Sequence, residues 1–175
     1  MCLSENNIAV LKTFSFRHKE YISSILREII AYYGSNLVGL AVFGSYARGA
    51  NRLNSDLDIL IILKDAPGFS QRLGEFVEQV EMKYEELAQE LYERDDILCE
   101  LSPYILTRQE ALKLQPIYYD LAEHHVVLYD PEGVLERIID STKRFLEQSR
   151  AERTNYGNTW EWSLGENFCP GGIDL

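Results

Sequence analysis

The pattern of apolar and polar positions first becomes regular after residue 15, where it predicts an amphipathic helix over residues 16–33. The apolar residues that recur at helical spacing are Ile22, Ile25, Leu26, Ile29 and Tyr33. This spacing gathers apolar side chains on one face of a helix, which can then pack on a core. Gly34 follows directly and predicts the end of the helix.

Two apolar runs predict strands over residues 37–43 and 56–63, joined by a turn and a short helix over residues 44–52. Successive side chains of a strand point to opposite faces. One face of the second strand therefore carries Leu57, Ile59, Ile61 and Leu63, and the other carries Asp56, Asp58, Leu60 and Ile62. Both faces are apolar beyond Asp58, which is typical of a strand covered by helices on each side.

Strand and helix patterns continue to alternate through residue 149. From Phe69 the apolar residues keep helical spacing for about six turns, which predicts one long helix. Further strands are predicted over residues 95–104 and 126–129, and further helices after Thr107, over residues 116–124 and from Pro131 to about residue 149. Thr107 with Glu110 three residues later predicts a capping box. This alternation predicts an α/β (α+β) fold, with a small mixed sheet and flanking helices.

The chain has 175 residues, of which 46% are hydrophobic, and this is enough for one well-cored domain. We expect residues 1–149 to form that domain and residues 150–175 to form a C-terminal tail. The tail is rich in Asn, Gly and Trp, and Trp160, Trp162 and Leu164 alternate like a short strand. We expect the two tryptophans to pack on the domain or on a partner, with stacking on a base as the alternative.

Asp56 and Asp58 pose an electrostatic problem, because both lie on one face at the start of a buried strand. Two neighbouring carboxylates repel each other and lose hydration when they are buried. A divalent cation between them would relieve both costs. Ligands that are all oxygen favour Mg²⁺, which takes one or two carboxylates together with substrate phosphates.

Charge and cysteine content narrow the classes of partner and compartment. Seventeen basic and 28 acidic residues give a net charge of −11, which argues against binding to a long nucleic acid. Cys2, Cys99 and Cys169 are odd in number and widely spaced, which predicts a reducing, cytoplasmic setting. No apolar run reaches the roughly 18 residues of a membrane span, and residues 1–11 lack the pattern of a signal peptide. We therefore expect no membrane association.

The motif Phe43-Gly44-Ser45, ten residues, and then Asp56-Leu57-Asp58-Ile59 resembles the signature of the DNA polymerase β-type nucleotidyltransferase superfamily. The short spacing and compact chain are most similar to the minimal nucleotidyltransferase branch. The resemblance implies that Gly44 and Ser45 open a helix that holds the triphosphate and that Asp56 and Asp58 hold Mg²⁺. Glycine also permits close approach of the backbone to a phosphate.

A third carboxylate on a neighbouring strand completes the site in active members of this superfamily, and it can act as general base. Glu100 is the best candidate because it is the acid inside the apolar run of the strand predicted over residues 95–104. Asp96 has the same parity and is its rival. We favour Glu100, since Asp95 and Asp96 fit the turn into the strand. Arg48 and Arg52 are candidates for phosphate contacts. His124 and His125 cannot both face one metal from a helix, so we expect them to be surface or core residues without a metal.

The resemblance implies a Mg²⁺-dependent enzyme that moves a nucleoside monophosphate, AMP from ATP, onto an acceptor hydroxyl and releases pyrophosphate. Minimal members of the branch often act as antitoxins that modify a tyrosine of a partner ribonuclease, so we expect a protein acceptor. One alternative is a non-catalytic partner-binding protein with a vestigial nucleotide site. The other is transfer to a small molecule such as an aminoglycoside.

Overall fold

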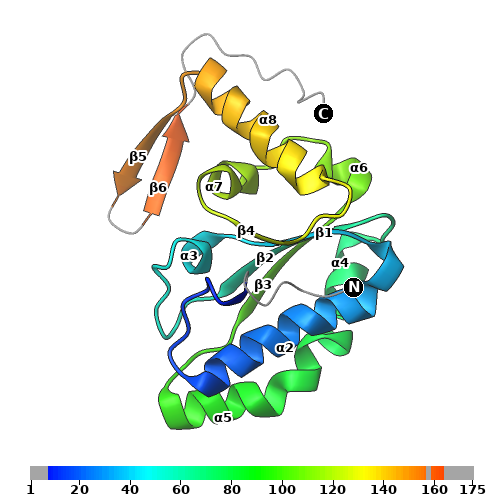
Figure 1. The fold of residues 1–175 in the computed structure, drawn as a ribbon, viewed down its shortest axis with the longest axis vertical. Helices are drawn as coiled ribbons and strands as arrows, with labels where there is room; N and C mark the ends of the chain where they lie inside the picture. Colours follow the sequence, from blue (N-terminus) through cyan, green and yellow to red (C-terminus); the bar gives the residue numbers. More distant parts are fainter. Residues whose placement is uncertain (1–7, 157–158, 164–175) are drawn as a thin grey trace.

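A four-stranded mixed sheet forms the centre of the molecule (Figure 1). The computed structural model describes residues 8–156 and 159–163, without the side chains of residues 155, 156, 159 and 160. The strands of the sheet are β1 (Leu37–Val42), β2 (Leu57–Leu63), β3 (Leu101–Thr107) and β4 (Val126–Tyr129), in the order β3-β2-β1-β4. β1 runs antiparallel to β2 and β4, and β2 runs parallel to β3. The predicted mixed sheet with flanking helices is confirmed.

Helices cover both faces of this sheet, as the parity of β2 predicted (Figure 1). The helical elements are α2 (Phe16–Tyr33), η1 (Gly34–Asn36), α3 (Gly44–Ala47), α4 (Phe69–Gln79), η2 (Glu81–Tyr84), α5 (Glu85–Asp95), α6 (Arg108–Ala111), α7 (Ile117–Glu123) and α8 (Val134–Gln148). Leu57, Ile59, Ile61 and Leu63 of β2 join one core cluster with α2 and α5. Leu60 and Ile62 join a second cluster with α7 and α8. Burial of both faces explains why β2 is almost continuously apolar.

Local signals set several boundaries correctly. The helix predicted over residues 16–33 is α2, and Ser15 caps its start by accepting a hydrogen bond from the backbone N–H of His18. Gly34 follows α2 with φ of +48°, a backbone region that glycine adopts without strain. The capping box of Thr107 and Glu110 is present at the start of α6. Glu110 also pairs with the buried Arg72 of α4, which ties α4 to the end of β3.

The prediction of one long helix from Phe69 is wrong. The structure breaks it at Val80, whose φ and ψ are −121° and −62°, and inserts the 3-10 turn η2 before α5. Val80 is fully buried, and η2 and α5 lie against α2 through the pairs Lys83–Glu28 and Arg17–Glu90. Helical spacing of apolar residues survives such a break, so the sequence pattern does not reveal it.

The strand predicted over residues 95–104 also begins later than expected. Asp96 follows α5 in a left-handed conformation, and residues 96–100 run without regular structure until β3 starts at Leu101. The backbone N–H of Leu98 donates to Leu53 O at 2.7 Å, so this segment is held by the loop before β2. Glu100 is therefore exposed and stands just outside the strand in which it was expected.

A separate hairpin of β5 (Glu152–Tyr156) and β6 (Thr159–Ser163) follows α8. β6 confirms the strand predicted around Trp160 and Trp162, whereas Leu164 lies outside the described residues. The Trp162 ring lies 6.0 Å from the Tyr119 ring, and Arg153 pairs with Glu123. Trp162 thus packs on the domain, as we expected for this side chain.

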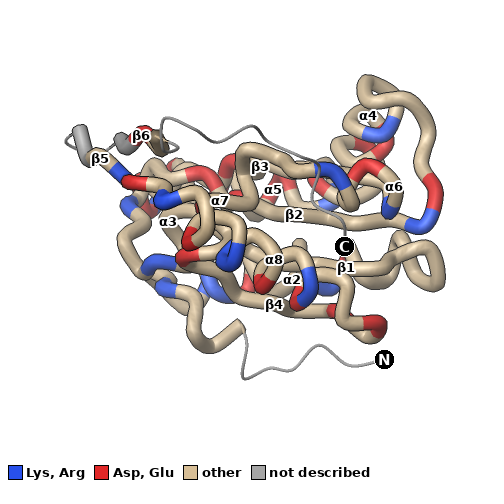
Figure 2. Tube along the Cα trace, turned by 90° about the horizontal axis from the view of Figure 1, so that it is seen from above, with Lys and Arg blue, Asp and Glu red and all other residues tan. Residues whose placement is uncertain are grey.

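Acidic and basic residues occur in both helical layers (Figure 2). Within the described part of the chain, none of the helices combines the length and the apolar character that a membrane span requires.

Candidate active site

The turn after β1 and the start of β2 are packed directly against each other. Gly44 has φ of +67°, and a Cβ atom there would lie 2.0 Å from Asp58 Oδ2. Such a distance is far inside van der Waals contact, so a side chain at residue 44 would displace the carboxylate. The backbone N–H of Phe43 also donates to Asp58 O at 3.1 Å. The structure therefore brings together the glycine and one of the aspartates that the sequence motif selected.

Asp58 is half-buried, and this position changes its acidity. Burial is the main cause that raises the pKa of Asp58 to about 6. A hydrogen bond with Ser102 opposes the rise, the charges of Asp56 and Asp120 add to it, and Arg48 opposes it. A carboxylate with two like-charged neighbours and a raised pKa is a position that a bound cation would stabilise. Asp56 itself is exposed one residue before β2.

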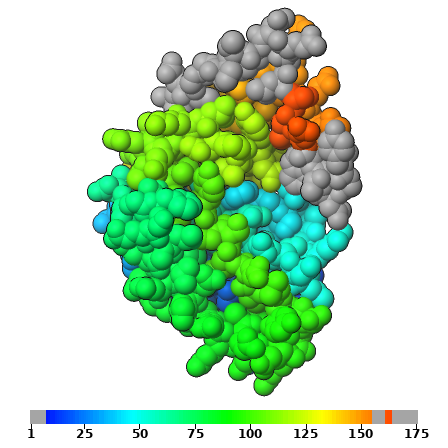
Figure 3. Space-filling model, turned by 180° about the vertical axis from the view of Figure 1, so that it is seen from behind, coloured from blue at the N-terminus to red at the C-terminus, as the bar shows by residue number. Residues whose placement is uncertain are grey.

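The register of β2 and β3 decides which residue faces Asp58. Asp58 lies opposite Ser102, not opposite an acid. One step earlier, the backbone N–H of Leu57 donates to Glu100 O at 2.9 Å, so Glu100 lies beside the start of β2. The charge of Glu100 raises the pKa of Glu81, but Glu100 is not among the carboxylates that raise the pKa of Asp58. The segments that carry the motif (cyan) and lead into β3 (green) lie side by side on one face (Figure 3).

Arg48 connects the motif to a helix that the sequence analysis did not assign to the site. Its Nη1 atom lies 3.3 Å from both Oδ1 and Oδ2 of Asp120 on α7. Burial is the main cause that raises the pKa of Asp120, and Arg48 opposes this rise. Asp120 and Ser102 are thus two site residues that sequence reasoning missed. An acid in a predicted helix carries no local signal of this kind, because the contact depends on how α7 packs over the sheet.

The short helix α3 is held from the other side by the side chain of Tyr46. The hydroxyl of Tyr46 and Nε2 of His18 lie 3.2 Å apart, and both side chains are buried. The backbone N–H of Phe14 donates to Nδ1 of His18, so a neutral ring carries its proton on Nε2 and donates it to Tyr46. Burial lowers the pKa of His18, which favours this neutral form. Ser45, the residue before Tyr46 in α3, is partly exposed.

The donors around Asp58 fit a hard divalent cation. Asp56 and Asp58 offer carboxylate oxygens, and burial, followed by the charges of Asp56 and Asp120, raises the pKa of Asp58. Among the described residues, no three Asp, Glu, His or Cys side chains converge into a complete metal cage. Mg²⁺ commonly takes one or two carboxylates and completes its shell with phosphates and water, so an incomplete set agrees with a site that binds metal and nucleotide together.

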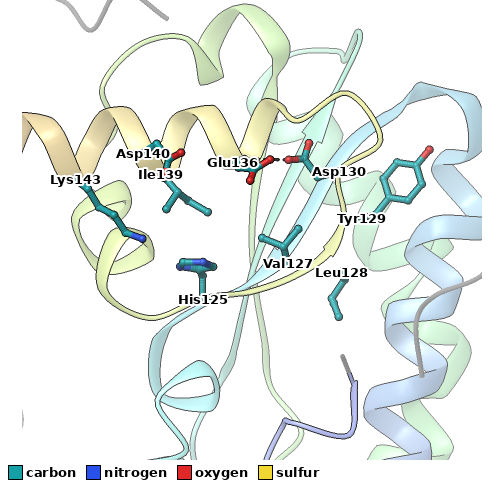
Figure 4. Close-up of a pocket in the computed structure, with 9 residues that line it drawn as sticks. All are labelled: His125, Val127, Leu128, Tyr129, Asp130, Glu136, Ile139, Asp140 and Lys143. Atoms are coloured by element: carbon teal, nitrogen blue, oxygen red, sulfur yellow. Dashed lines mark hydrogen bonds between the residues drawn. The ribbon is translucent and has the colours of Figure 1, made fainter. Parts of the chain in front are cut away.

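A pocket lies away from the motif, between β4 and α8 (Figure 4). It has a volume of about 560 Å³, and its lining includes His125, Glu136, Asp140 and Lys143. No residue of the motif lines it. His125 Nδ1 lies 2.7 Å from Leu121 O, so this histidine has the ordinary structural contact that the sequence analysis expected of it.

A family model described as a nucleotidyltransferase domain matches residues 22–128. The matched range contains the whole motif from Phe43 to Ile59, the strands of the sheet up to Leu128, Glu100 and Asp120. No curated protein matches the sequence.

Several solved structures are similar to this one. A spectinomycin adenyltransferase, AAD(9), from Enterococcus faecialis with ATP and spectinomycin is 15% identical and matches 75% of this chain and 68% of its own, with a TM-score of 0.51. A toxin-antitoxin with AMP-PNP is 17% identical over 72% of this chain and 90% of its own, with a TM-score of 0.43. One chain in the complex of a tri-AMPylated Shewanella oneidensis HEPN toxin with MNT antitoxin is 15% identical and matches 75% of this chain and 92% of its own, with a TM-score of 0.41. At this identity, the likeness to the adenyltransferase shows a shared fold.

Proposed function

This chain belongs to the nucleotidyltransferase domain family, and we propose that it transfers a nucleoside monophosphate, AMP from ATP, onto an acceptor hydroxyl and releases pyrophosphate. The contact between Gly44 and Asp58 carries the proposal. It packs the turn that would receive phosphates against the carboxylate that would receive the metal. Two parts of the family motif that are separated in sequence therefore meet in one place.

Asp56 and Asp58 are the proposed Mg²⁺ ligands. When it is bound, Mg²⁺ supplies positive charge that neutralises the phosphates and orients them for displacement. The backbone at Gly44, the hydroxyl of Ser45 and the guanidinium of Arg48 are the proposed phosphate contacts of this chain. Arg48 is suited to this role because guanidinium recognises phosphate oxygens with two parallel donors.

Glu100 is the proposed third carboxylate, which would accept the proton of the acceptor hydroxyl. The hydrogen bond from Leu57 N to Glu100 O supports this role, because it fixes the backbone of Glu100 beside the start of β2. Glu100 also has the parity of Ser102, which lies opposite Asp58. The exposed position of its side chain would allow it to meet an acceptor from outside.

The proposed acceptor is a hydroxyl of a partner protein, as the resemblance to minimal nucleotidyltransferases implies. The alternative is a small cationic acceptor. AAD(9) acts on spectinomycin, as its name states, and it shares the fold of this chain. About a third of that enzyme, however, lies outside the 68% that matches.

A transfer assay with the purified chain, α-labelled ATP and Mg²⁺ tests the proposal. The assay is run with the protein encoded beside it, with a panel of aminoglycosides and spectinomycin, and without any added acceptor. Label on the neighbouring protein supports the protein acceptor, and a labelled small molecule supports the alternative. Asp56→Asn with Asp58→Asn is the inactive control. Binding of the neighbour without any transfer by wild type would contradict an enzymatic role and support a non-catalytic binding protein.

A further inference from the structure

Arg48 and Asp120 form an ion pair that bridges the nucleotide motif and α7. Both oxygens of Asp120 lie 3.3 Å from Nη1 of Arg48, and the two side chains are 21% and 20% exposed. Arg48 directly follows α3, the helix opened by Gly44. A partly buried ion pair is screened less by salt than a surface pair, so its attraction is stronger than that of an exposed arginine with a carboxylate.

The helix that carries Asp120 is fixed by contacts on several sides. The buried hydroxyl of Tyr118 donates to Ala111 O at 2.9 Å. The Tyr119 ring stacks on Phe145 of α8, with ring centres 6.1 Å apart and planes inclined by 7°. Trp162 of β6 contacts the same ring, and Glu123 pairs with Arg153 of β5. Asp120 therefore projects from a helix that contacts α6, α8 and the hairpin.

The ion pair is connected to the proposed metal ligand through the turn of the motif. The backbone N–H of Arg48 donates to Gly44 O at 3.2 Å, and Gly44 packs directly against Asp58 Oδ2. The charge of Arg48 lowers the pKa of Asp58, and the charge of Asp120 raises it. The two carboxylates thus compete for one guanidinium. If Asp120 were absent, the attraction between Arg48 and Asp58 would lack this competitor, and an arginine drawn onto Asp58 would occupy an oxygen proposed for the metal.

We propose that Asp120 is a positioning residue that acts through Arg48. By holding the guanidinium on α7, it keeps Arg48 beside Asp58 for the phosphates of the nucleotide and leaves the Asp58 carboxylate for the metal. This inference rests on the proposed function of the site. It adds a residue from α7 that lies outside the sequence motif, and it makes the anchoring of α7 part of nucleotide binding.

A double-mutant cycle tests this role with Asp120→Ala, Arg48→Ala and the combined variant. The readouts are KM for ATP, kcat and the dissociation constant of a non-hydrolysable ATP analogue. Asp120→Ala should raise KM and the dissociation constant about tenfold, equivalent to about 1.4 kcal/mol, and change kcat less. In the Arg48→Ala background, Asp120→Ala should have no further effect, because its partner is already gone.

Two further variants separate positioning from a loss of folding. Asp120→Glu keeps the charge and should recover much of the affinity, whereas the nearly isosteric Asp120→Asn should not. Glu132→Gln is the matched control. It breaks the ion pair of Arg108 with Glu132, which is 2.7 Å long and includes no residue of the motif, and it should leave all three readouts unchanged. Thermal melts verify that each variant is folded.

Independent, multiplying effects of the two substitutions would overturn the inference, as would unchanged nucleotide affinity in folded Asp120→Asn. A wild-type chain that binds the analogue without turnover would contradict the proposed function but not the inference. The dissociation constants of the analogue for the variants would then test the role of Asp120. A wild-type chain that does not bind the analogue would contradict both.

Discussion

The guanidinium of Arg48 acts on two aspartates, Asp58 and Asp120, whereas the charges that act on Glu81 of η2 are those of two other glutamates, Glu100 and Glu85. Arg48 lowers the pKa of both aspartates in the first group. In the second, burial is the main cause that raises the pKa of Glu81, and the charges of Glu100 and Glu85 add to the rise. Among the described residues, no hydrogen bond or ion pair involves the Glu81 side chain. Glu81 and Glu85 line a pocket of about 260 Å³ between α2 and α5.

The two groups are assembled in different ways. The first joins Arg48, which follows α3, and Asp58 of β2 with Asp120 of α7, which is more than 60 residues further along the chain than Asp58. The second lies mainly at the break between α4 and α5, with Glu100 added from the segment before β3. Opposite charges that packing brings together from separate elements indicate a preorganised site, whereas neighbouring acids close to solvent cost little and are a common feature of helix surfaces. Glu100 has contacts with both groups: its backbone accepts a hydrogen bond at the start of β2, and its charge raises the pKa of Glu81. Variants of Glu100 therefore decide to which group it belongs.

Asp58→Asn should have the largest effect on activity. Loss of an outer partner of a metal ligand already costs about 10- to 100-fold, so loss of the ligand should lower transfer more than about 100-fold. A labelled-ATP assay measures this. Transfer by Asp58→Asn at the wild-type rate would remove Asp58 from the metal site and the first group from catalysis.

The same variant should be more stable than wild type in the absence of metal and nucleotide. The folded-state pKa of Asp58 is raised from 3.8 to about 6, so ionisation of Asp58 costs stability as pH rises through this interval, and the full cost remains above it. Asp58→Asn should therefore gain about 1–2 kcal/mol at pH 7 and little below pH 4, as urea unfolding in EDTA would measure.

Gly44→Ala should disrupt the first group through its backbone. Its Cβ atom would lie 2.0 Å from Asp58 Oδ2 at a φ of +67°. Strain and displacement of the carboxylate should cost about 2–4 kcal/mol and remove most of the activity. Gly74→Ala is the matched control: nothing lies within 4 Å of its Cβ position, and in the middle of α4 it should add about 0.5–1 kcal/mol. Equal stability of the two variants would show that the close contact is not maintained in solution.

Glu100→Gln and Asp96→Asn decide whether Glu100 belongs with the aspartates or with the glutamates. A third carboxylate of the active site should lower kcat about 10- to 100-fold when it is replaced by its amide, with the fold intact. Asp96→Asn should leave kcat unchanged, because Asp96 ends α5 in an exposed turn. The opposite result would make Asp96 the third carboxylate, and no effect of either would place Glu100 with Glu81.

Glu81→Gln should have the smallest effect. Burial and two neighbouring acids raise the pKa of Glu81, so its ionised form destabilises the fold above the ordinary glutamate pKa. The amide should stabilise the chain at pH 7 by less than about 1 kcal/mol and leave transfer unchanged. Urea unfolding at pH 7 and at pH 4 measures this difference. Lower activity in a folded Glu81→Gln chain would show that the two groups work together.

Local patterns predicted much of the scaffold because the interactions that set it are short in sequence. The parity of β2, the helix ended by Gly34 and the capping box of Thr107 each depend on residues within a few positions. The break at Val80 was missed because a 3-10 turn can preserve helical spacing of apolar residues. The late start of β3 was missed because hydrogen bonds to residues far back in the chain, such as Leu53, hold residues 96–100.

The sequence by itself determined the family motif, the strand with two buried faces and the carboxylates at its start. Tertiary structure alone decided that Asp58 faces Ser102, that Arg48 pairs with Asp120 and that Glu100 stands outside the strand. The reason is physical. Periodicity and caps report the nearest neighbours along the chain, whereas strand register and the placement of α7 are fixed by packing two cores on opposite faces of one sheet.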